Sequence, residues 1–230
     1  MMNKLIIGNW KLNGSTLLLD EFIKLVDAPD LVIALPNVFI LYANDRKRRF
    51  KIAAQDCSIY DDFGPYTGEV SAKMLYEAGC QYVIVGHSER RTLLAETPQH
   101  ILKKLKNVVK NNMIAVFCID ENYKKSVNKE TKEFLENHKD RVVLAYEPLS
   151  AIGTGVTPPP FEISTKLETI KKEYFGIKSV YGGSVNSENA KSILSINEVD
   201  GVLIGGGSLK TEELNKIVKI TLNQCMRSKA

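Results

Sequence analysis

The sequence has few cysteines and no long apolar run, and both absences exclude a class of protein. The cysteines are Cys57, Cys80, Cys118 and Cys225. They lie far apart and form no Cys-x-x-Cys pair, so the sequence predicts neither a disulfide framework nor a zinc site. No run approaches the roughly 18 consecutive apolar residues that a membrane helix needs. We therefore expect a protein of the reducing cytoplasm that is neither exported nor membrane-spanning.

The sequence also lacks a strong excess of charge and any extended linker. The 31 Lys and Arg residues against 27 Asp and Glu residues give a net charge of +4, which suits a protein that handles small anions and falls short of nucleic-acid binding. The basic run at residues 46–49 is predicted to be a solvated helix end. With 230 residues, 44% of them hydrophobic, and no low-complexity linker, the chain is expected to form one domain over residues 1–230.

Short apolar runs alternate with longer helical patterns along the whole chain. The eight predicted strands are Leu5–Gly8, Leu31–Leu35, Ile52–Ala54, Tyr82–Val85, Ile114–Cys118, Val142–Tyr146, Ser179–Tyr181 and Val202–Ile204. The clearest helix spans Thr97–Asn111, with Thr97 as its cap and Pro98 in its first turn. The helix after Glu121 has the weakest pattern. Such alternation is typical of right-handed βαβ crossovers.

Eight βα units in one chain favour a (β/α)8 barrel, and a doubly wound open sheet is the alternative. Polar or glycine-rich segments directly follow strands one, four, six, seven and eight; they are residues 9–11, 86–91, 147, 182–184 and 205–208. These segments can meet at one small site only if the sheet closes. The sequence therefore favours a closed barrel with a site at the carboxyl ends of its strands.

The central stretch is the sixth strand, which ends in Glu147-Pro148 before a small, glycine-punctuated loop, residues 149–155. A carboxylate at a buried strand end is costly unless it is paired or used. A structural ion pair is one interpretation of Glu147. The loop favours the other, because its composition suits a lid that closes over an anion with backbone N–H groups.

Six segments together resemble the triosephosphate isomerase family. They are residues 8–14 (GNWKLNG), 66–71 (YTGEVS), 85–91 (VGHSERR), 145–148 with 151–155 (AYEP and AIGTG), 181–186 (YGGSVN) and 200–206 (DGVLIGG). They appear in the family's order and cover nearly the whole chain. The resemblance implies a TIM barrel that interconverts dihydroxyacetone phosphate and D-glyceraldehyde 3-phosphate through an enediolate, in glycolysis and gluconeogenesis, with no cofactor or metal.

The resemblance also assigns roles to residues. Glu147 is the expected base, and His87, Lys11 and Asn9 are the expected donors to the enediolate oxygens; in the family the glutamate is the base and the histidine is neutral. Glu89 and Glu96 are expected to be supporting polar residues. The alternative for each is an ordinary core or surface residue.

Phosphate binding is expected from backbone N–H groups, because the sequence has no P-loop and no arginine cluster for it. The residues expected to bind the substrate are Gly153, Ser184, Gly205 and Gly206, together with Asn9 and Lys11. By resemblance, the loop around Thr67 inserts near the lysine and histidine of a second copy. A homodimer is therefore expected, and the alternative is a mobile surface loop.

The chain departs from the family pattern at four positions. Leu12 replaces Met, Asp120 replaces Gly, Ser150 replaces the lid's Trp, and Val156 replaces Lys. None of these changes removes a proposed catalytic group.

Two other function classes remain open. Another phosphosugar enzyme on the same barrel needs its own base or an inner-strand lysine for a Schiff base, and no lysine interrupts the strand cores. A catalytically silent binder is expected to lack Glu147 or His87, and both are present.

Overall fold

A computed structural model describes residues 4–60, 62–151 and 154–227, in which eight parallel strands close into a barrel. The strands are β1 (Leu5–Asn9), β2 (Asp27–Leu35), β3 (Arg49–Ala54), β4 (Tyr82–Val85), β5 (Ile114–Ile119), β6 (Val142–Tyr146), β7 (Ser179–Tyr181) and β8 (Gly201–Ile204). They pair in sequence order, and β8 pairs back onto β1 with Val202 opposite Ile6. The predicted (β/α)8 barrel is confirmed, and the alternative open sheet is wrong.

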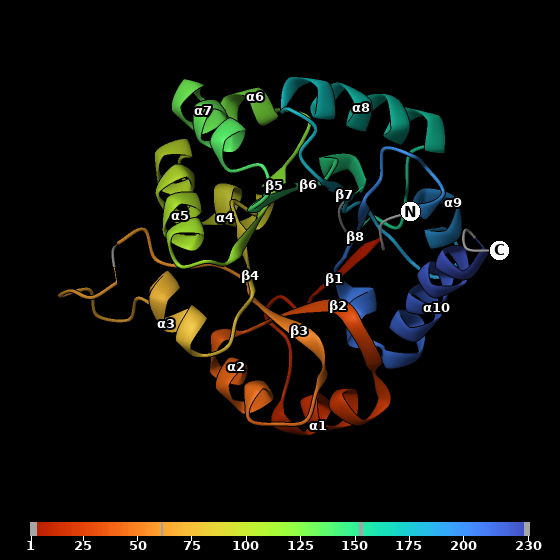
Figure 1. Cartoon of the computed structure of the whole chain (residues 1–230), viewed down its shortest axis with the longest axis horizontal. Coiled ribbons are helices and arrows are strands. Elements are labelled where there is room, and N and C mark those ends of the chain that lie inside the picture. Colours follow the sequence, from red (N-terminus) through yellow and green to blue (C-terminus); the bar gives the residue numbers. More distant parts are fainter. Residues whose placement is uncertain (1–3, 61, 152–153, 228–230) are drawn as a thin grey trace.

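Helices form a ring around these strands (Figure 1). They are α1 (Thr16–Leu25), α2 (Asn37–Asn44), α3 (Ala72–Glu77), α4 (Ser88–Leu93), α5 (Pro98–Lys110), α6 (Tyr123–Ser126), α7 (Lys129–Asn137), α8 (Pro160–Glu173), α9 (Ala190–Leu194) and α10 (Thr211–Arg227). The predicted cap of α5 is confirmed, because the Thr97 side chain accepts from the amide of His100. The segment after Glu121, whose helical pattern is weak, forms the short α6 and then α7.

The alternation of side chains along the strands divides the core into two layers. One set points into the barrel and packs together: Ile7, Val32, Ala34, Ala53, Tyr82, Ile84, Val116, Cys118, Val143, Ala145, Val180 and Leu203. The alternate residues point outward and pack under the helices, where Phe22 makes edge-to-face contacts with Trp10 and Phe50. Packing in these two layers holds the strands in place. The polar residues of the candidate site lie at the ends of these strands.

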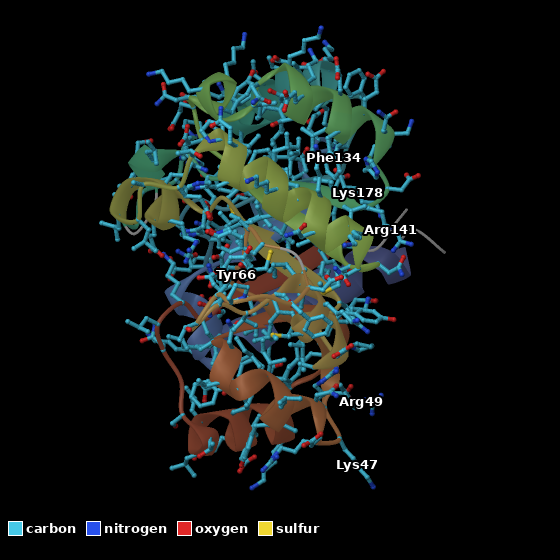
Figure 2. All side chains as sticks on the ribbon, turned by 90° about the vertical axis from the view of Figure 1, so that its left-hand side faces the viewer. Lys47, Arg49, Tyr66, Phe134, Arg141 and Lys178 are labelled. Atoms are coloured by element: carbon cyan, nitrogen blue, oxygen red, sulfur yellow. The ribbon has the colours of Figure 1, made fainter. Side chains whose placement is uncertain are left out.

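Two predicted boundaries need correction. β2 begins at Asp27, ahead of the predicted Leu31, because a polar segment containing Pro29 runs alongside β3 before the register shifts. The basic run at residues 46–49 is only partly a helix end. Arg46 follows α2 and donates to the carbonyl of Tyr42 at 2.9 Å, but Arg49 already begins β3 and pairs with Asp27 at 2.7 Å. Lys47 and Arg49 point away from the protein (Figure 2).

The amino-terminal end of the barrel is the mouth opposite the clustered polar residues. It holds a cavity of about 880 Å³, and Lys171 and Lys51 are among the residues that line this cavity. Lys171 lies 2.6 Å from Asp200, and Lys51 lies 3.4 Å from Asp30, so both cations are neutralised locally. Across the described ranges, no helix is both long enough and apolar enough to cross a membrane.

Candidate active site

The carboxyl ends of β4 and β6 bring His87 and Glu147 together inside the barrel mouth. His87 Nε2 lies 3.3 Å from Glu147 Oε1, and both side chains are almost fully buried. Within the described part of the chain, Glu147 Oε2 is buried without a hydrogen-bond partner. A buried carboxylate oxygen of this kind carries a desolvation cost. The structural ion-pair interpretation therefore explains only one of the two oxygens of Glu147.

The backbone of α4 fixes the tautomer of His87. The Glu89 amide donates to His87 Nδ1 at 3.2 Å, so the imidazole serves as the cap of this helix. An amide N–H can only donate, and Nδ1 must then carry a lone pair. Glu89 Oε2 also lies 3.5 Å from Nδ1, but the shorter amide contact decides the arrangement. The ring is neutral, and its proton lies on Nε2, the atom that faces Glu147.

Two further groups pack against the Glu147 carboxylate. Gly182 must be glycine, because a Cβ atom there would lie 2.8 Å from Glu147 Cγ. Cys118, from β5, is fully buried beside Glu147, and burial followed by the charge of Glu147 raises the pKa of its thiol well above the ordinary value. Cys118 therefore stays protonated at neutral pH and adds no second negative charge beside the carboxylate.

Lys11 and Asn9 extend the site from the end of β1. Lys11 has a φ of +52°, a left-handed conformation that is strained for a residue with a long side chain. Its amide donates to Asn9 Oδ1 at 3.0 Å, and its Nζ lies 2.6 Å from Glu89 Oε1. Glu89 therefore connects the lysine to the helix that His87 caps. The predicted meeting of Asn9, Lys11, His87 and Glu147 at one barrel mouth agrees with this arrangement.

Gln55 also belongs to this arrangement, although the sequence analysis missed it. Its side-chain amide donates to the carbonyl of Lys11 at 2.9 Å and to the carbonyl of Ala34 at 3.0 Å. It thereby ties the strained backbone of Lys11 to the end of β2. The available clue was its position, because Gln55 is a polar residue directly after a buried strand, as are the residues that were predicted.

The loops after β7 and β8 lie at the same mouth, and β8 is the direct neighbour of β1. Gly205 lies beside Lys11, since a Cβ atom on Gly205 would be 3.7 Å from Lys11 Cε, and no atom of the described residues lies within 4 Å of the corresponding position on Gly206. Gly206 opens a one-turn helix, Gly206–Leu209, whose first amides have no acceptor inside the helix. This backbone is open to an approaching anion. Gly153, which was also expected to bind substrate, lies outside the described residues.

Ser184 connects the β7 loop to the segment between β6 and α8, residues 148–159, which we call the lid. Its hydroxyl accepts from the amide of Gly155 at 3.1 Å and donates to the carbonyl of Ala151. At the other end of the lid, Glu121 accepts from the amide of Leu149 at 3.1 Å. Ala151 and Gly155 of the lid therefore lie against the β7 loop, although Ser150 supplies no large apolar contact.

Asp120, which stands where the family pattern has Gly, forms an ion pair inside the protein. Arg91 Nη2 lies 2.6 Å from Asp120 Oδ2, and Arg91 also donates to the carbonyls of Gly86 and Cys118. This guanidinium joins the carboxyl ends of β4 and β5, directly behind His87. The pairing could not be predicted, because the two residues are 29 positions apart in the sequence.

We expect Asp120→Asn to lower the free energy of unfolding in urea by about 2–4 kcal/mol, because the mostly buried guanidinium loses its countercharge. Glu168→Gln is the matched control, since it breaks an exposed pair between Lys172 and Glu168. Its effect should stay below about 0.5 kcal/mol. Equal effects of the two substitutions would contradict a structural role for the Arg91–Asp120 pair.

Glu96, which the resemblance implied as a supporting polar residue, lies in a cluster apart from His87 and Glu147. It contacts Lys104, which also lies 2.7 Å from Asp56, while Arg90 lies 2.8 Å from Asp56. Lys104 and Glu96 are both buried. Their contact supports the packing of α5 and the base of the β3–α3 loop instead of touching the mouth. Among the described residues, no group of side chains is suited to hold a metal ion.

Comparison with known proteins gives a consistent result. A family model described as Triosephosphate isomerase matches residues 4–221. The chain is 37% identical over 245 residues to the Triosephosphate isomerase of Francisella philomiragia, covering 94% of this chain and 96% of that protein. It is also 37% identical over 250 residues to the Triosephosphate isomerase of Chloroherpeton thalassium, covering 95% and 99%. The chain therefore belongs to the triosephosphate isomerase family.

Proposed function

We propose that the protein interconverts dihydroxyacetone phosphate and D-glyceraldehyde 3-phosphate, with Glu147 as the base. The observation that carries this proposal is the buried pair of Glu147 and neutral His87, 3.3 Å apart, with one carboxylate oxygen of Glu147 unpartnered. The reaction requires removal of a weakly acidic proton from a carbon beside a carbonyl. A buried carboxylate at the site of that proton is a suitable base.

The negative charge that develops on the enediolate oxygens needs donors. Nε2–H of His87 faces the reaction site and can donate without carrying a charge, while the Lys11 ammonium adds a positive charge. The Asn9 side chain holds the Lys11 backbone through the 3.0 Å contact. Glu147 then returns the proton to the neighbouring carbon, which completes the aldose–ketose exchange.

The substrate phosphate is proposed to bind between the β7 and β8 loops. Gly205 and Gly206 offer an unobstructed backbone, and Ser184 lies across from them on the loop that contacts the lid. Lys11 lies next to Gly205 and balances part of the dianion's charge. Gly153, at the lid tip, is proposed to add an amide donor when the lid covers the phosphate.

A homodimer is the proposed assembly. The β3–α3 loop extends beyond the ring of helices (Figure 1), and Figure 2 looks onto this side, with Tyr66 near its centre. Tyr66 stacks on Tyr60 at 3.6 Å, and Phe63 on the same loop is exposed. Leu12, next to Lys11, is 97% exposed in the single chain. Protruding and exposed apolar groups of this kind suit a contact between two copies of the chain. The proposed dimer is a cytoplasmic enzyme of glycolysis and gluconeogenesis.

A coupled assay tests the proposed activity. Purified protein is mixed with D-glyceraldehyde 3-phosphate, and the dihydroxyacetone phosphate formed is reduced by a second enzyme with NADH. We expect NADH consumption in proportion to the amount of protein, with no requirement for added metal. Protein that is folded by circular dichroism but produces no dihydroxyacetone phosphate would show that the proposed function is wrong.

A further inference from the structure

Asn189 directly precedes α9, but its side chain does not cap this helix. An asparagine at a helix start usually accepts from an amide in the first turn, yet Asn189 makes no such bond. Its Nδ2 instead donates to Thr157 Oγ1 at 3.1 Å and to the carbonyl of Ser184 at 3.0 Å. Its Oδ1 accepts from the amide of Asn186 at 2.9 Å, which fixes the orientation of the side-chain amide.

These bonds join the carboxyl-terminal end of the lid to the β7 loop. Thr157 is a lid residue, and its hydroxyl lies 3.4 Å from the carbonyls of Gly183 and Ser184. Asn189 therefore touches two segments that meet at the proposed phosphate site. Lid opening at this end must break the bond between Asn189 and Thr157, whereas the bond to Ser184 lies within the β7 side and can remain.

The local sequence leaves the lid few other ways to be fastened here. Residues 158–160 are three prolines, which have no amide N–H to donate. The nearby hydroxyl of Tyr181 is buried and has no partner within the residues that the structure describes. The side chains of Thr157 and Asn189 thus supply hydrogen bonds that the proline-rich backbone cannot make.

We propose that Asn189 is a positioning residue that latches the carboxyl-terminal end of the lid onto the phosphate-binding β7 loop. This inference rests on the proposed isomerase function, because the benefit of a closed lid is the exclusion of water from the enediolate. If water and mobile groups reach that intermediate, its bond to the phosphate oxygen breaks. Phosphate leaves with the electron pair, and the remaining enol tautomerises to methylglyoxal.

The test compares Asn189→Ala, Thr157→Val and the double variant with the wild-type protein. The first removes the donor, and the second replaces the hydroxyl with a methyl group of similar size. For each protein, kcat, KM and the amount of methylglyoxal formed per isomerisation are measured. Losing the hydrogen bond that holds the lid residue Thr157 to Asn189 should raise the methylglyoxal ratio and KM by roughly three- to tenfold in Asn189→Ala.

The double variant shows whether the two side chains act through one bond. If they do, it should leak no more methylglyoxal than the worse single variant. Ser192→Ala is the matched control, because this α9 hydroxyl donates to the carbonyl of Asn189, at the start of its own helix; it should behave as wild type. A wild-type protein without isomerase activity would refute the proposed function.

Active wild-type protein with an unchanged methylglyoxal ratio in Asn189→Ala would refute only the latch. If Asn189→Ala does not fold, Thr157→Val decides alone, since it leaves α9 and the β7 loop intact. An unchanged ratio and an unchanged KM in Thr157→Val would then overturn the latch.

Discussion

Replacing Glu147 with Gln should lower kcat by at least roughly 10²–10⁴-fold, the loss typical when a general base is removed. The amide is nearly the same size as the carboxylate, so it can occupy the same space beside Gly182 and His87. It cannot accept the substrate's proton at neutral pH. Steady-state kinetics with D-glyceraldehyde 3-phosphate measure the change directly.

The binding of glycerol 3-phosphate separates lost chemistry from lost structure. This compound carries the phosphate but no carbonyl, so it cannot form an enediolate. Its affinity for Glu147→Gln should stay close to that of the wild-type protein. A variant that retained near-full turnover would contradict the role of Glu147, and one that lost both turnover and binding would indicate a disrupted site.

Replacing Thr67 with Arg should convert the proposed dimer into monomers of low activity. Thr67 and Gly68 are the central residues of a tight turn, in which the Tyr66 carbonyl accepts from the Glu69 amide at 3.1 Å and Gly68 has a φ of +90°. Thr67 is exposed in this turn. A guanidinium placed there cannot enter a close contact with the partner without losing its hydration.

Activity should fall with the dimer because Lys11 is held in a strained conformation next to the exposed Leu12. If the partner's loop covers that segment, its removal allows Lys11 to shift. A displacement of about 1 Å can cost roughly 10²-fold in rate. Light scattering gives the mass, and Thr67→Ser, which keeps a small hydroxyl residue, serves as the control. A fully active wild-type monomer would rule out this account.

The sequence was sufficient to predict the barrel because its evidence is local. Each buried strand is a short apolar run, and a parallel strand places its following residue at the same end of the barrel as its neighbours. That rule placed the segments that contain Asn9, His87 and Glu147 at one end, and the family resemblance implied their roles. It could not predict the pairings of Asn189 and Asp120, because their partners lie 32 and 29 residues away in the sequence.

The strain at Lys11 also could not be predicted. A positive φ at a lysine is unfavourable locally, and it persists because Asn9 and Gln55 bond the backbone on both sides of the residue. For Glu96 the family resemblance implied a supporting role, and the structure shows that its side chain contacts Lys104.

The central claim is that one carboxylate moves a proton between adjacent carbons through an enediolate. Incubating dihydroxyacetone phosphate with the protein in D₂O tests it most directly, with proton NMR used to follow the hydrogens on the hydroxymethyl carbon. Over many turnovers, the account predicts that the wild-type protein replaces one of these two hydrogens with deuterium, and that Glu147→Gln does so far more slowly. Isomerisation without any exchange, or exchange by Glu147→Gln at the wild-type rate, would contradict the account.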